Sequence, residues 1–470
     1  MGVSSQARFG KGKTDVILFQ VFSTNKKLRM PGFGVNYLAS SLQSAGIGAK
    51  VLNTLQYYAE GKQDEMILQR IRNYDPSIVG ISSISFTNKE LVRISELVKK
   101  NNPHILTVVG GYGPTNKRDL VKSLGIDVLV YGEGESTLRE ITEEWLEGNR
   151  DLSRVRGIVY KKGSEVVSTE PRDLEANLDL FPFPDREIVD DSPLNRKNIL
   201  ITARGCPFTC SFCAIPKFYS SGKRWRERTT KNIVDELLIL ADKKDLSSYV
   251  EFYDDEFLIR GERLDEILEE MGRYPSLKDL KIAFAARADS IIRHGAQIEK
   301  NMGKIQEIFC GIETFNEDYL SKLNKGANGA QALDTNVQVV EFLQKNRIPA
   351  KYGFIVPPQA PNAAYLRDHL PIRFTKRINL SDLVMRFTSL NNYEVPFDSE
   401  EGDPRIILSE VTKRYIQIMD HFERCLRRNI RGKIVPAEKF ISFFNCALSY
   451  AETGNKEQYA MAEKMFGDTA

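Results

Sequence analysis

The chain has no uninterrupted apolar run of the roughly 18 residues that a membrane-spanning helix requires. Residues 1–13 are polar and basic without an apolar core, so they indicate a frayed tail and not a secretory signal. The net charge is only +3, from 66 basic and 63 acidic residues, which does not favour a nucleic-acid-binding protein. We therefore expect a cytoplasmic protein that contacts no membrane and no nucleic acid.

Cysteine is scarce, with six residues in a chain of 470, yet three of them stand close together. Cys206, Cys210 and Cys213 have the spacing C-x3-C-x2-C. Buried apolar cysteines rarely cluster so tightly, a disulfide would leave one thiol over, and zinc usually takes four ligands, commonly in two spaced pairs. Three thiolates on one loop instead fit a [4Fe–4S] cluster, which is normally held by four Cys. The missing fourth ligand leaves one iron open to bind another molecule.

The first part of the chain alternates short apolar runs with helical patterns between residues 14 and 147. Strands are predicted at 15–21, 51–55, 78–82, 105–111 and 128–131, and helices at 34–45, 65–74 and 88–100. Continuous apolar strands that alternate with helices indicate an α/β domain with a parallel, Rossmann-like sheet covered on both faces. We assign this domain to residues 14–150.

The predicted strand ends of this domain are rich in small and polar residues, and open parallel sheets bind their ligands at such ends. No G-x-G-x-x-G follows the first strand, which argues against a dinucleotide. Tight turns between strands and helices are the alternative explanation for these residues. The candidate ligand-binding residues are Ser82, Ser83, Ser85, Gly110, Gly111, Tyr112, Thr115, Gly132, Glu133, Gly134 and Glu135.

The rest of the chain divides into three parts. Residues 151–196 are predicted to form a β-hairpin and a Pro-rich, semi-rigid linker. A second series of strands follows at 199–202, 249–253, 281–286, 307–310 and 350–356, with helices between them. Repeated βα units with polar strand ends are typical of a barrel-like enzyme whose site lies at that face. Residues 391–470 form a C-terminal helical domain, with helices predicted at 405–429, 437–451 and 456–466.

The cysteine loop after the first strand of a βα series resembles the radical SAM superfamily. The resemblance implies a partial (βα)6 barrel over residues 197–390. It also implies that S-adenosylmethionine (SAM) binds the open iron and is cleaved to a 5′-deoxyadenosyl radical, which takes a hydrogen from the substrate. Cys206, Cys210 and Cys213 are then both the metal ligands and the catalytic residues.

The resemblance also assigns SAM-binding positions. Phe212 matches an aromatic residue that packs near the adenine, although ordinary loop packing would also explain it. Asp254 and Asp255 lie where relatives bind the SAM amino group, with helix capping as the alternative. Arg287 lies where relatives place a basic residue near the SAM carboxylate or ribose, with a surface salt bridge as the alternative. Glu313 lies where relatives place a polar residue near SAM.

Residues 14–147 resemble the cobalamin-binding domain that precedes the radical SAM domain in one subfamily. The match is incomplete, because Gly113 stands where the family often has a histidine. A cobalt-ligating D-x-H-x-x-G motif is absent, and the only histidine of the domain, His104, is predicted at the far end of a helix–strand turn. The resemblance therefore implies cobalamin whose lower face is unligated or meets a side chain other than histidine, with Leu28, Arg29 and Met30 as candidates.

This resemblance implies a cobalamin-dependent radical SAM methyltransferase that acts on an unactivated carbon or a phosphorus through methylcobalamin. The alternative is a radical SAM dehydratase, epimerase, rearrangement or ring-forming enzyme whose first domain binds cobalamin without methyl transfer or is only structural. A non-enzymatic iron–sulfur or cobalamin sensor is a further alternative. The expected partners are a small-molecule or peptide substrate and a reductase such as flavodoxin or ferredoxin.

Overall fold

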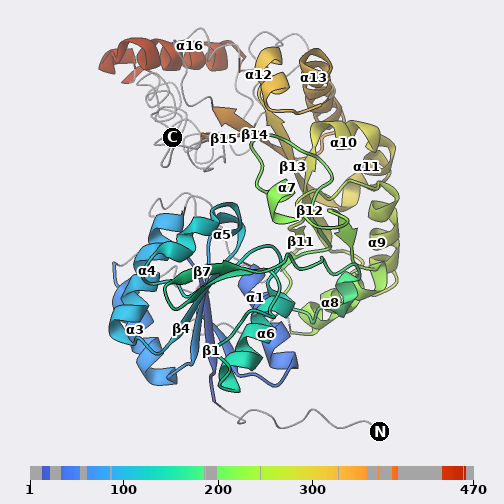
Figure 1. Ribbon diagram of the computed structural model, residues 1–470. Helices are drawn as coiled ribbons and strands as arrows, with labels where there is room; N and C mark the ends of the chain where they lie inside the picture. Colours follow the sequence, from blue (N-terminus) through green and yellow to red (C-terminus); the bar gives the residue numbers. More distant parts are fainter. Residues whose placement is uncertain are drawn as a thin grey trace. The chain divides into compact units, whose positions relative to one another are not determined.

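The computed structural model describes residues 13–21, 33–52, 61–84, 87–184, 186, 198–243, 245–326, 328–356, 369, 384–389, 437–458 and 460–461. These residues form two compact units (Figure 1). The first contains the described residues up to position 186 together with Gly205–Pro207 and Ala214–Thr229, and the second contains Asn198–Arg204, Phe208–Cys213 and the described residues from Thr230 onward. The predicted cofactor residues Leu28, Arg29, Met30 and Ser85 and the predicted helix at 405–429 lie outside the described residues.

The first unit is built on a seven-stranded sheet with the order β2-β1-β3-β4-β5-β6-β7. Strands β1 to β5 pair in parallel, which confirms the predicted Rossmann-like sheet. The predicted hairpin, β6 and β7, continues the same sheet because β6 pairs antiparallel with β5. The strands are β1 Val16–Gln20, β2 Ala49–Leu52, β3 Ile78–Ser82, β4 Leu106–Gly110, β5 Val128–Val130, β6 Ile158–Lys162 and β7 Glu165–Ser168.

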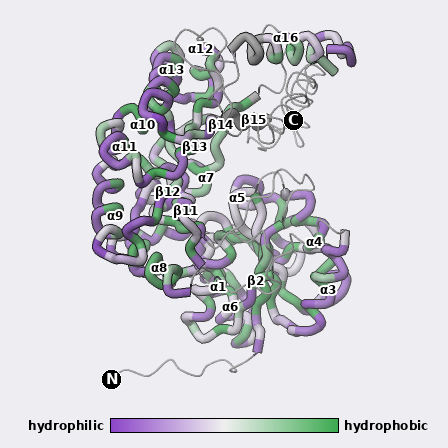
Figure 2. The backbone as a smooth tube through the Cα atoms, turned by 180° about the vertical axis from the view of Figure 1, so that it is seen from behind, coloured by the Kyte–Doolittle hydropathy of each residue, from purple (hydrophilic) through white to green (hydrophobic). Residues whose placement is uncertain are grey.

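Helices cover both faces of this sheet, which explains why its central strands are apolar on both sides. Helices α1 and α6 pack on one face, and α3 and α4 pack on the other (Figure 1). Figure 2 shows hydrophobic residues along the strands and mostly hydrophilic residues along α3. The helical segments are α1 Gly34–Ser44, α3 Gln63–Tyr74, α4 Asn88–Asn101, α5 Tyr112–Asn116, η3 Arg118–Lys122, α6 Glu135–Leu146, η4 Leu178–Leu180 and α7 Ile215–Phe218, and a short strand, β10, spans Arg226–Glu227.

The second unit contains a six-stranded sheet with the order β15-β14-β13-β12-β11-β8, in which all neighbouring strands are parallel. This sheet agrees with the predicted partial barrel. The prediction missed β15, because Arg386 interrupts its apolar pattern. The strands are β8 Ile199–Leu200, β11 Tyr249–Phe252, β12 Lys281–Arg287, β13 Ile305–Glu313, β14 Ala350–Val356 and β15 Val384–Ser389, and a short strand, β9, spans Ala203–Arg204.

The core of the second unit lies between these strands and the helices that connect them. The rings of Phe252, Phe257 and Phe284 stack in its centre, with centroid separations of 5.4 and 4.7 Å. Contacts between buried aromatic rings stabilise the folded state by more than the burial of their apolar area alone. The helical segments are α8 Thr230–Asp242, α9 Glu262–Gly272, α10 Ala288–Arg293, α11 Gly295–Asn301, η5 Met302–Lys304, α12 Glu317–Lys322, α13 Gly329–Lys345 and α16 Ala437–Thr453.

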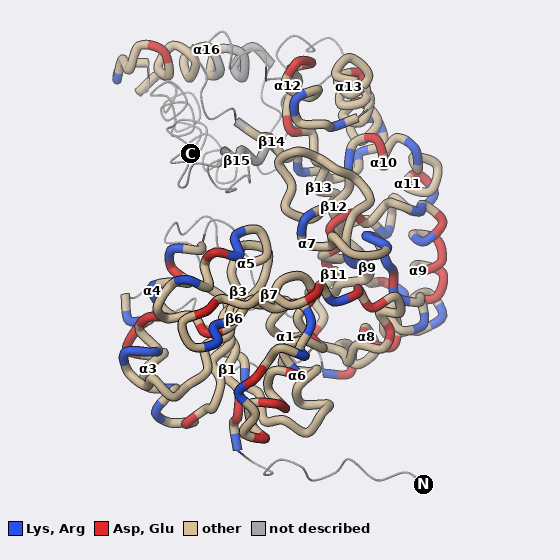
Figure 3. Tube along the Cα trace, in the orientation of Figure 1, with Lys and Arg blue, Asp and Glu red and all other residues tan. Residues whose placement is uncertain are grey.

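Acidic and basic residues are interspersed around α3, α6 and α9 (Figure 3).

Among the described helices, none has both the length and the apolar character needed to cross a bilayer. The helix predicted at 437–451 is confirmed by α16.

Candidate active site

The cysteine loop follows β9 and begins with a residue that must be glycine. Gly205 has φ of +85°, and a Cβ there would lie 1.6 Å from the carbonyl oxygen of Arg224. Cys206, Cys210 and Cys213 are partly exposed, and none forms a disulfide within the described residues. The backbone N–H of Cys213 donates to the carbonyl of Cys210 at 3.1 Å, which closes a turn between these two ligands.

Residues at the end of α12 and just after it form hydrogen bonds with the second half of this loop. Ser211 donates its backbone N–H to the carbonyl of Leu323 and its hydroxyl to the carbonyl of Lys322, both at 3.0 Å. The side chain of Asn324 donates to the carbonyl of Thr209 at 2.9 Å. Phe212 packs against a small apolar cluster of Tyr319, Leu323 and Ile355. None of these residues at the end of α12 and in the turn after it was predicted; the one sequence signal is the Asn324-Lys325-Gly326 run, which is typical of a tight turn. Asn324 has a left-handed φ of +51°.

Arg287, at the end of β12, contacts a cluster ligand directly. Its Nη1 donates to the Sγ of Cys210 at 2.9 Å, while Nε and Nη2 donate to the two carboxylate oxygens of Asp289 at 2.8 and 3.1 Å. Its guanidinium carbon lies 3.9 Å from the centroid of the Phe208 ring. Burial lowers the pKa of Arg287, but the hydrogen bonds to Asp289 and the charge of Cys210 outweigh it, so the pKa is raised. Arg287 is therefore held on several sides and is only 7% exposed.

Asp254, just after β11, is buried and binds the chain that leads into the cysteine loop. Its carboxylate accepts the backbone N–H groups of Thr202 and Ala203 at 2.6 and 3.0 Å, as well as the hydroxyl of Thr202. Arg263 on α9 lies 3.5 Å from this carboxylate and also donates to the carbonyl of Thr202. Arg263 is 1% exposed, so this pair is a buried ion pair. Burial raises the pKa of Asp254 against the opposing effect of Arg263. Its neighbour Asp255 is exposed.

Glu256 is a second buried carboxyl, and it was not among the predicted site residues. It is 2% exposed, and its Oε2 accepts the backbone N–H of Arg287 at 2.8 Å. Its other oxygen has no hydrogen-bond partner among the described residues. Burial raises the pKa of this carboxyl to about 7.

Glu313 ends β13 at a bulge and has a left-handed φ of +66°. Its carboxylate accepts from the ammonium of Lys325 at 2.6 Å, and both side chains are buried. Burial and the charge of Arg287 lower the pKa of Lys325, but Glu313 and, to a smaller extent, Cys210 outweigh them, so the pKa is raised. The sequence analysis identified Glu313 but not Lys325, whose only signal is its place in the turn after α12. Cys310, in the middle of β13, is buried, and burial raises the pKa of its thiol.

The cysteine loop fits a [4Fe–4S] cluster better than a single metal ion. No three His, Cys, Asp or Glu side chains among the described residues converge to hold one ion. A cluster does not need such convergence, because each thiolate binds a different iron. The three thiols are partly exposed, and the guanidinium of Arg287 donates a hydrogen bond to the sulfur of Cys210.

In the first unit, the predicted ligand-binding residues lie at the carboxyl ends of β3, β4 and β5. Most of them are partly exposed, namely Ser82, Gly110, Gly111, Tyr112, Gly132, Glu133 and Gly134. Three are buried: Ser83, Thr115 and Glu135. Gly111 has φ of +100°, and a Cβ there would lie 2.5 Å from the carbonyl of Ser83. The side chain of Ser83 itself bonds to Thr87 and Asn88, so it stabilises the connection between β3 and α4. An edge of small, partly exposed residues fits a flat ligand such as a corrin, which must approach the backbone closely.

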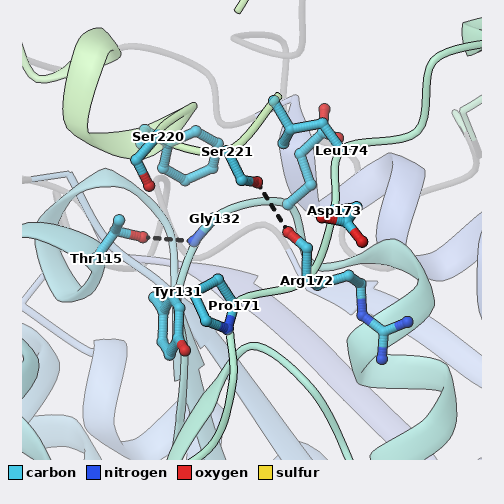
Figure 4. Close-up of a pocket in the computed structure, with 11 residues that line it drawn as sticks. Thr115, Tyr131, Gly132, Pro171, Arg172, Asp173, Leu174, Ser220 and Ser221 are labelled. Carbon is cyan, nitrogen blue, oxygen red and sulfur yellow. Dashed lines mark hydrogen bonds between the residues drawn. The ribbon is translucent and has the colours of Figure 1, made fainter. Parts of the chain in front are cut away.

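Two of these residues have partners that the sequence did not predict. Glu133 forms a bidentate ion pair with Arg226, at 2.9 Å for both hydrogen bonds, and Arg226 is 3% exposed. The ring of Tyr112 packs on Phe218 with a centroid separation of 4.4 Å. Figure 4 shows the small pocket beside them, where Thr115 accepts from the backbone N–H of Gly132 at 3.0 Å and Ser221 donates to the carbonyl of Arg172 at 2.9 Å. The segment Ala214–Thr229 thus packs on this edge of the first unit.

The histidines take different places. His104 is exposed in the turn before β4, so it lies at the opposite end of that strand from the candidate ligand-binding loop. His369 is 5% exposed, and its Nδ1 hydrogen-bonds the hydroxyl of Thr314 at 2.7 Å. Burial lowers the pKa of His369 to about 4, so it is neutral near pH 7.

The sequence matches two families, the B12 binding domain over residues 20–142 and the radical SAM superfamily over residues 200–362. An uncharacterized methyltransferase of Pyrococcus horikoshii is 27% identical over 362 residues, which cover 74% of each chain. An anaerobic magnesium-protoporphyrin IX monomethyl ester cyclase of Rubrivivax gelatinosus is 27% identical over 353 residues, which cover 72% of this chain and 61% of the cyclase. The structure of the cobalamin-dependent SAM radical enzyme OxsB with aqua-cobalamin bound has the same fold, with a TM-score of 0.69, 16% identity and coverage of 96% of this chain and 75% of OxsB.

These matches agree with the geometry of both units. The radical SAM match contains the cysteine loop and the ends of β11 to β13, and it implies a [4Fe–4S] cluster and SAM as cofactors. The B12-binding match contains the edge of small residues at the ends of β3 to β5, and it implies cobalamin. The chain therefore belongs to the radical SAM superfamily and is a radical SAM enzyme whose radical SAM domain follows a B12-binding domain.

Proposed function

We propose that this enzyme is a cobalamin-dependent methyltransferase that acts on an unactivated carbon or a phosphorus of a small molecule or peptide. The observation that carries the proposal is the combination, in one chain, of a C-x3-C-x2-C loop and a B12-binding domain. Similarity to a methyltransferase over 74% of each chain supports methyl transfer as the outcome. The chain covers only 61% of the cyclase that it also resembles.

The cluster, SAM and cobalamin can each be assigned to candidate residues. Cys206, Cys210 and Cys213 hold the cluster, which with SAM supplies a 5′-deoxyadenosyl radical, while cobalamin supplies a transferable methyl group. Phe212 and Asp255 remain the predicted SAM contacts whose side chains have the exposure to reach a ligand. Glu313 remains a predicted contact through its backbone at the bulge, because Lys325 already binds its carboxylate. Asp254 and Arg287 were predicted to bind SAM too, but the polar atoms of their side chains already have partners in the protein.

The edge of the first unit is the proposed cobalamin site. Gly110, Gly111 and Gly132 allow a corrin to approach the backbone, and Ser82, Gly134 and Glu135 border the same loops. No histidine lies at this edge among the described residues. We therefore expect cobalamin to bind without a protein imidazole on cobalt.

The proposed cellular context follows from the cofactors. A [4Fe–4S] cluster with an open iron is sensitive to oxygen, so the reducing cytoplasm is the compartment that suits it. The cluster needs one electron for each SAM cleavage, and a flavodoxin or ferredoxin system is the expected donor.

Anaerobic reconstitution tests the proposal. The purified protein is loaded with iron, sulfide and hydroxocobalamin, and iron, sulfide and corrin are then assayed. With SAM and a reductant, the methyltransferase should produce 5′-deoxyadenosine and S-adenosylhomocysteine, the product that marks methyl transfer from SAM. The triple variant Cys206→Ala, Cys210→Ala, Cys213→Ala should lose iron and all SAM cleavage, and a cluster retained by this variant would contradict the assignment.

The second candidate is ring closure or another radical rearrangement, which the similarity to the ester cyclase favours. Such an enzyme would release 5′-deoxyadenosine without S-adenosylhomocysteine under the same conditions. The ratio of the two products therefore separates the candidates before the substrate is known. Binding of the corrin without SAM cleavage would instead indicate a cobalamin sensor.

A further inference from the structure

We propose that Arg287 is a positioning residue for the cluster and not a SAM ligand: its guanidinium donates a hydrogen bond to the Cys210 sulfur and makes the cluster easier to reduce. This inference rests on the proposed function, because it requires the cluster that Cys206, Cys210 and Cys213 hold.

The protein holds the side chain of Arg287 so that its Nη1 faces the sulfur of Cys210. A guanidinium presents its donors along defined edges, and the edge formed by Nε and Nη2 is taken by both oxygens of Asp289, at 2.8 and 3.1 Å. One face of the group lies over the ring of Phe208. The backbone N–H of Arg287 is bound by Glu256, which fixes the start of the side chain. The remaining nitrogen, Nη1, is the one that meets Cys210.

The same geometry argues against a SAM carboxylate on Arg287. Arginine binds a carboxylate best through two parallel N–H groups of one edge, and Asp289 already has that arrangement. A SAM carboxylate would have to displace Asp289 or bind the other edge, whose Nη1 already donates to Cys210. Arg287 was predicted to lie near SAM because relatives often have a basic residue at this strand end, and that position does not distinguish SAM from the cluster.

The expected effect on the cluster follows from charge. Reduction adds one electron, and part of that charge falls on the thiolate sulfurs, so an N–H donor at a sulfur stabilises the reduced form. Arg287 is 7% exposed, and solvent screens a buried donor weakly. Lys325 also lies near Cys210, but Glu313 accepts from its ammonium at 2.6 Å and offsets its charge. Asp289 offsets part of the charge of Arg287, but it binds the edge opposite to Nη1, so the donor dipole still points at the sulfur.

The test measures the midpoint potential of the cluster in the full-length, reconstituted protein without SAM. Dithionite reduces the cluster by one electron, and the EPR signal of the reduced form is followed against potential. Arg287→Gln should lower the ratio of reduced to oxidised cluster at a fixed potential about tenfold, which is 59 mV for a one-electron couple. Arg293→Gln is the matched control, because Arg293 is an exposed arginine on α10 and the substitution removes the same charge. The control should keep the midpoint of the unmodified protein.

An unchanged midpoint in Arg287→Gln, combined with weaker SAM binding, would overturn the inference and return Arg287 to SAM. If Arg287→Gln does not retain iron, the inference is tested on the unmodified protein by isotope labelling. Protein labelled with ¹⁵N-arginine should then show a weak ¹⁵N coupling in the pulsed EPR spectrum of the reduced cluster without SAM, and absence of that coupling would overturn the inference. Failure of the unmodified protein to bind iron would instead contradict the proposed function itself.

Discussion

The carboxylate of Asp254 accepts the backbone N–H of Thr202 at 2.6 Å, and Thr202 lies four positions before the first cluster ligand in the sequence. Arg263 completes the contact by donating to the carbonyl of the same residue. Both the N–H and the C=O of Thr202 are thereby bound by a buried ion pair. This pair fixes the direction in which the chain leaves β8 toward the cysteine loop.

Removing one charge of this pair should be costly. Asp254→Asn removes the carboxylate that faces the buried Arg263, and breaking a buried ion pair in this way typically destabilises a protein by about 3–5 kcal/mol. Asp255→Asn is the matched control, because Asp255 is exposed and a surface change of this kind costs less than about 0.5 kcal/mol. Urea unfolding of both variants under anaerobic conditions measures the difference. A stable Asp254→Asn variant that binds SAM weakly would instead support the SAM contact predicted for Asp254.

The buried carboxyl of Glu256 should make stability depend on pH. Its pKa is raised from 4.5 to about 7, so the folded state holds its proton over a range in which the unfolded state releases it. Stability from this group is therefore present below pH 4.5 and is lost as the pH rises toward 7, by about 3 kcal/mol in total. Glu256→Gln removes this dependence.

Urea midpoints at pH 5 and pH 8 for the two proteins provide the measurement. The Gln variant should become more stable relative to the unmodified protein as the pH rises from 5 to 8. The titration of His369 is common to both proteins and cancels in the comparison. A constant difference between the two proteins over this range would show that Glu256 is not protonated in the folded state near neutral pH.

The sequence predicts the elements of both sheets well and their side-chain partners poorly. Runs such as Ile78–Ser82 and Ala350–Val356 are apolar and bounded by polar turns, and this local pattern suffices to predict a buried strand. The spacing of the three cysteines is likewise local. Arg263, in contrast, lies in an amphipathic helix pattern and resembles any surface arginine until α9 packs next to Asp254.

The residues at strand ends were predicted correctly in position, but their side-chain partners were not predicted. Glu133 was predicted to bind a cofactor because ligands bind at the carboxyl ends of parallel strands, and Asp254 and Arg287 were predicted to do so because relatives have SAM-binding groups at these strand ends. Each has a charged partner within its own unit: Arg263, Arg226 and Asp289. Those partners are set by long-range packing or by side-chain geometry, which a single sequence does not reveal. Position at a strand end therefore predicts the neighbourhood of the site better than the role of each residue.

The ion pair between Glu133 and Arg226 gives a third prediction. Arg226 is almost fully buried and also donates to the carbonyl of Glu175 at 2.7 Å, so Glu133→Gln would leave a buried charge without its partner. We expect a loss of about 3 kcal/mol in stability, with weaker binding of hydroxocobalamin as a consequence. Glu140→Gln is the control in the same unit, because the Glu140–Arg172 pair is partly exposed and should be worth at most about 1 kcal/mol.

Thermal unfolding and corrin titration separate two roles for Glu133. A residue that only holds Arg226 should lower the unfolding temperature of the protein even when no corrin is present. A residue that only binds cobalamin should leave that temperature unchanged and weaken corrin binding. The buried bidentate geometry favours the first result.

The lower face of cobalamin is the subject of the last prediction. His104 is the only histidine between residues 14 and 150, and it is exposed in the turn at the amino end of β4, whereas Gly110 and Gly111 stand at the carboxyl end. Five strand residues at roughly 3.3 Å each separate the two ends, so the imidazole cannot reach a ligand held at the opposite edge. The EPR spectrum of the cob(II)alamin-loaded protein should show no coupling to protein histidine nitrogen, and ¹⁵N-histidine labelling should leave the spectrum unchanged. His104→Ala should bind hydroxocobalamin with unaltered affinity, and a loss of affinity or a change of the spectrum on labelling would show that a histidine does ligate cobalt.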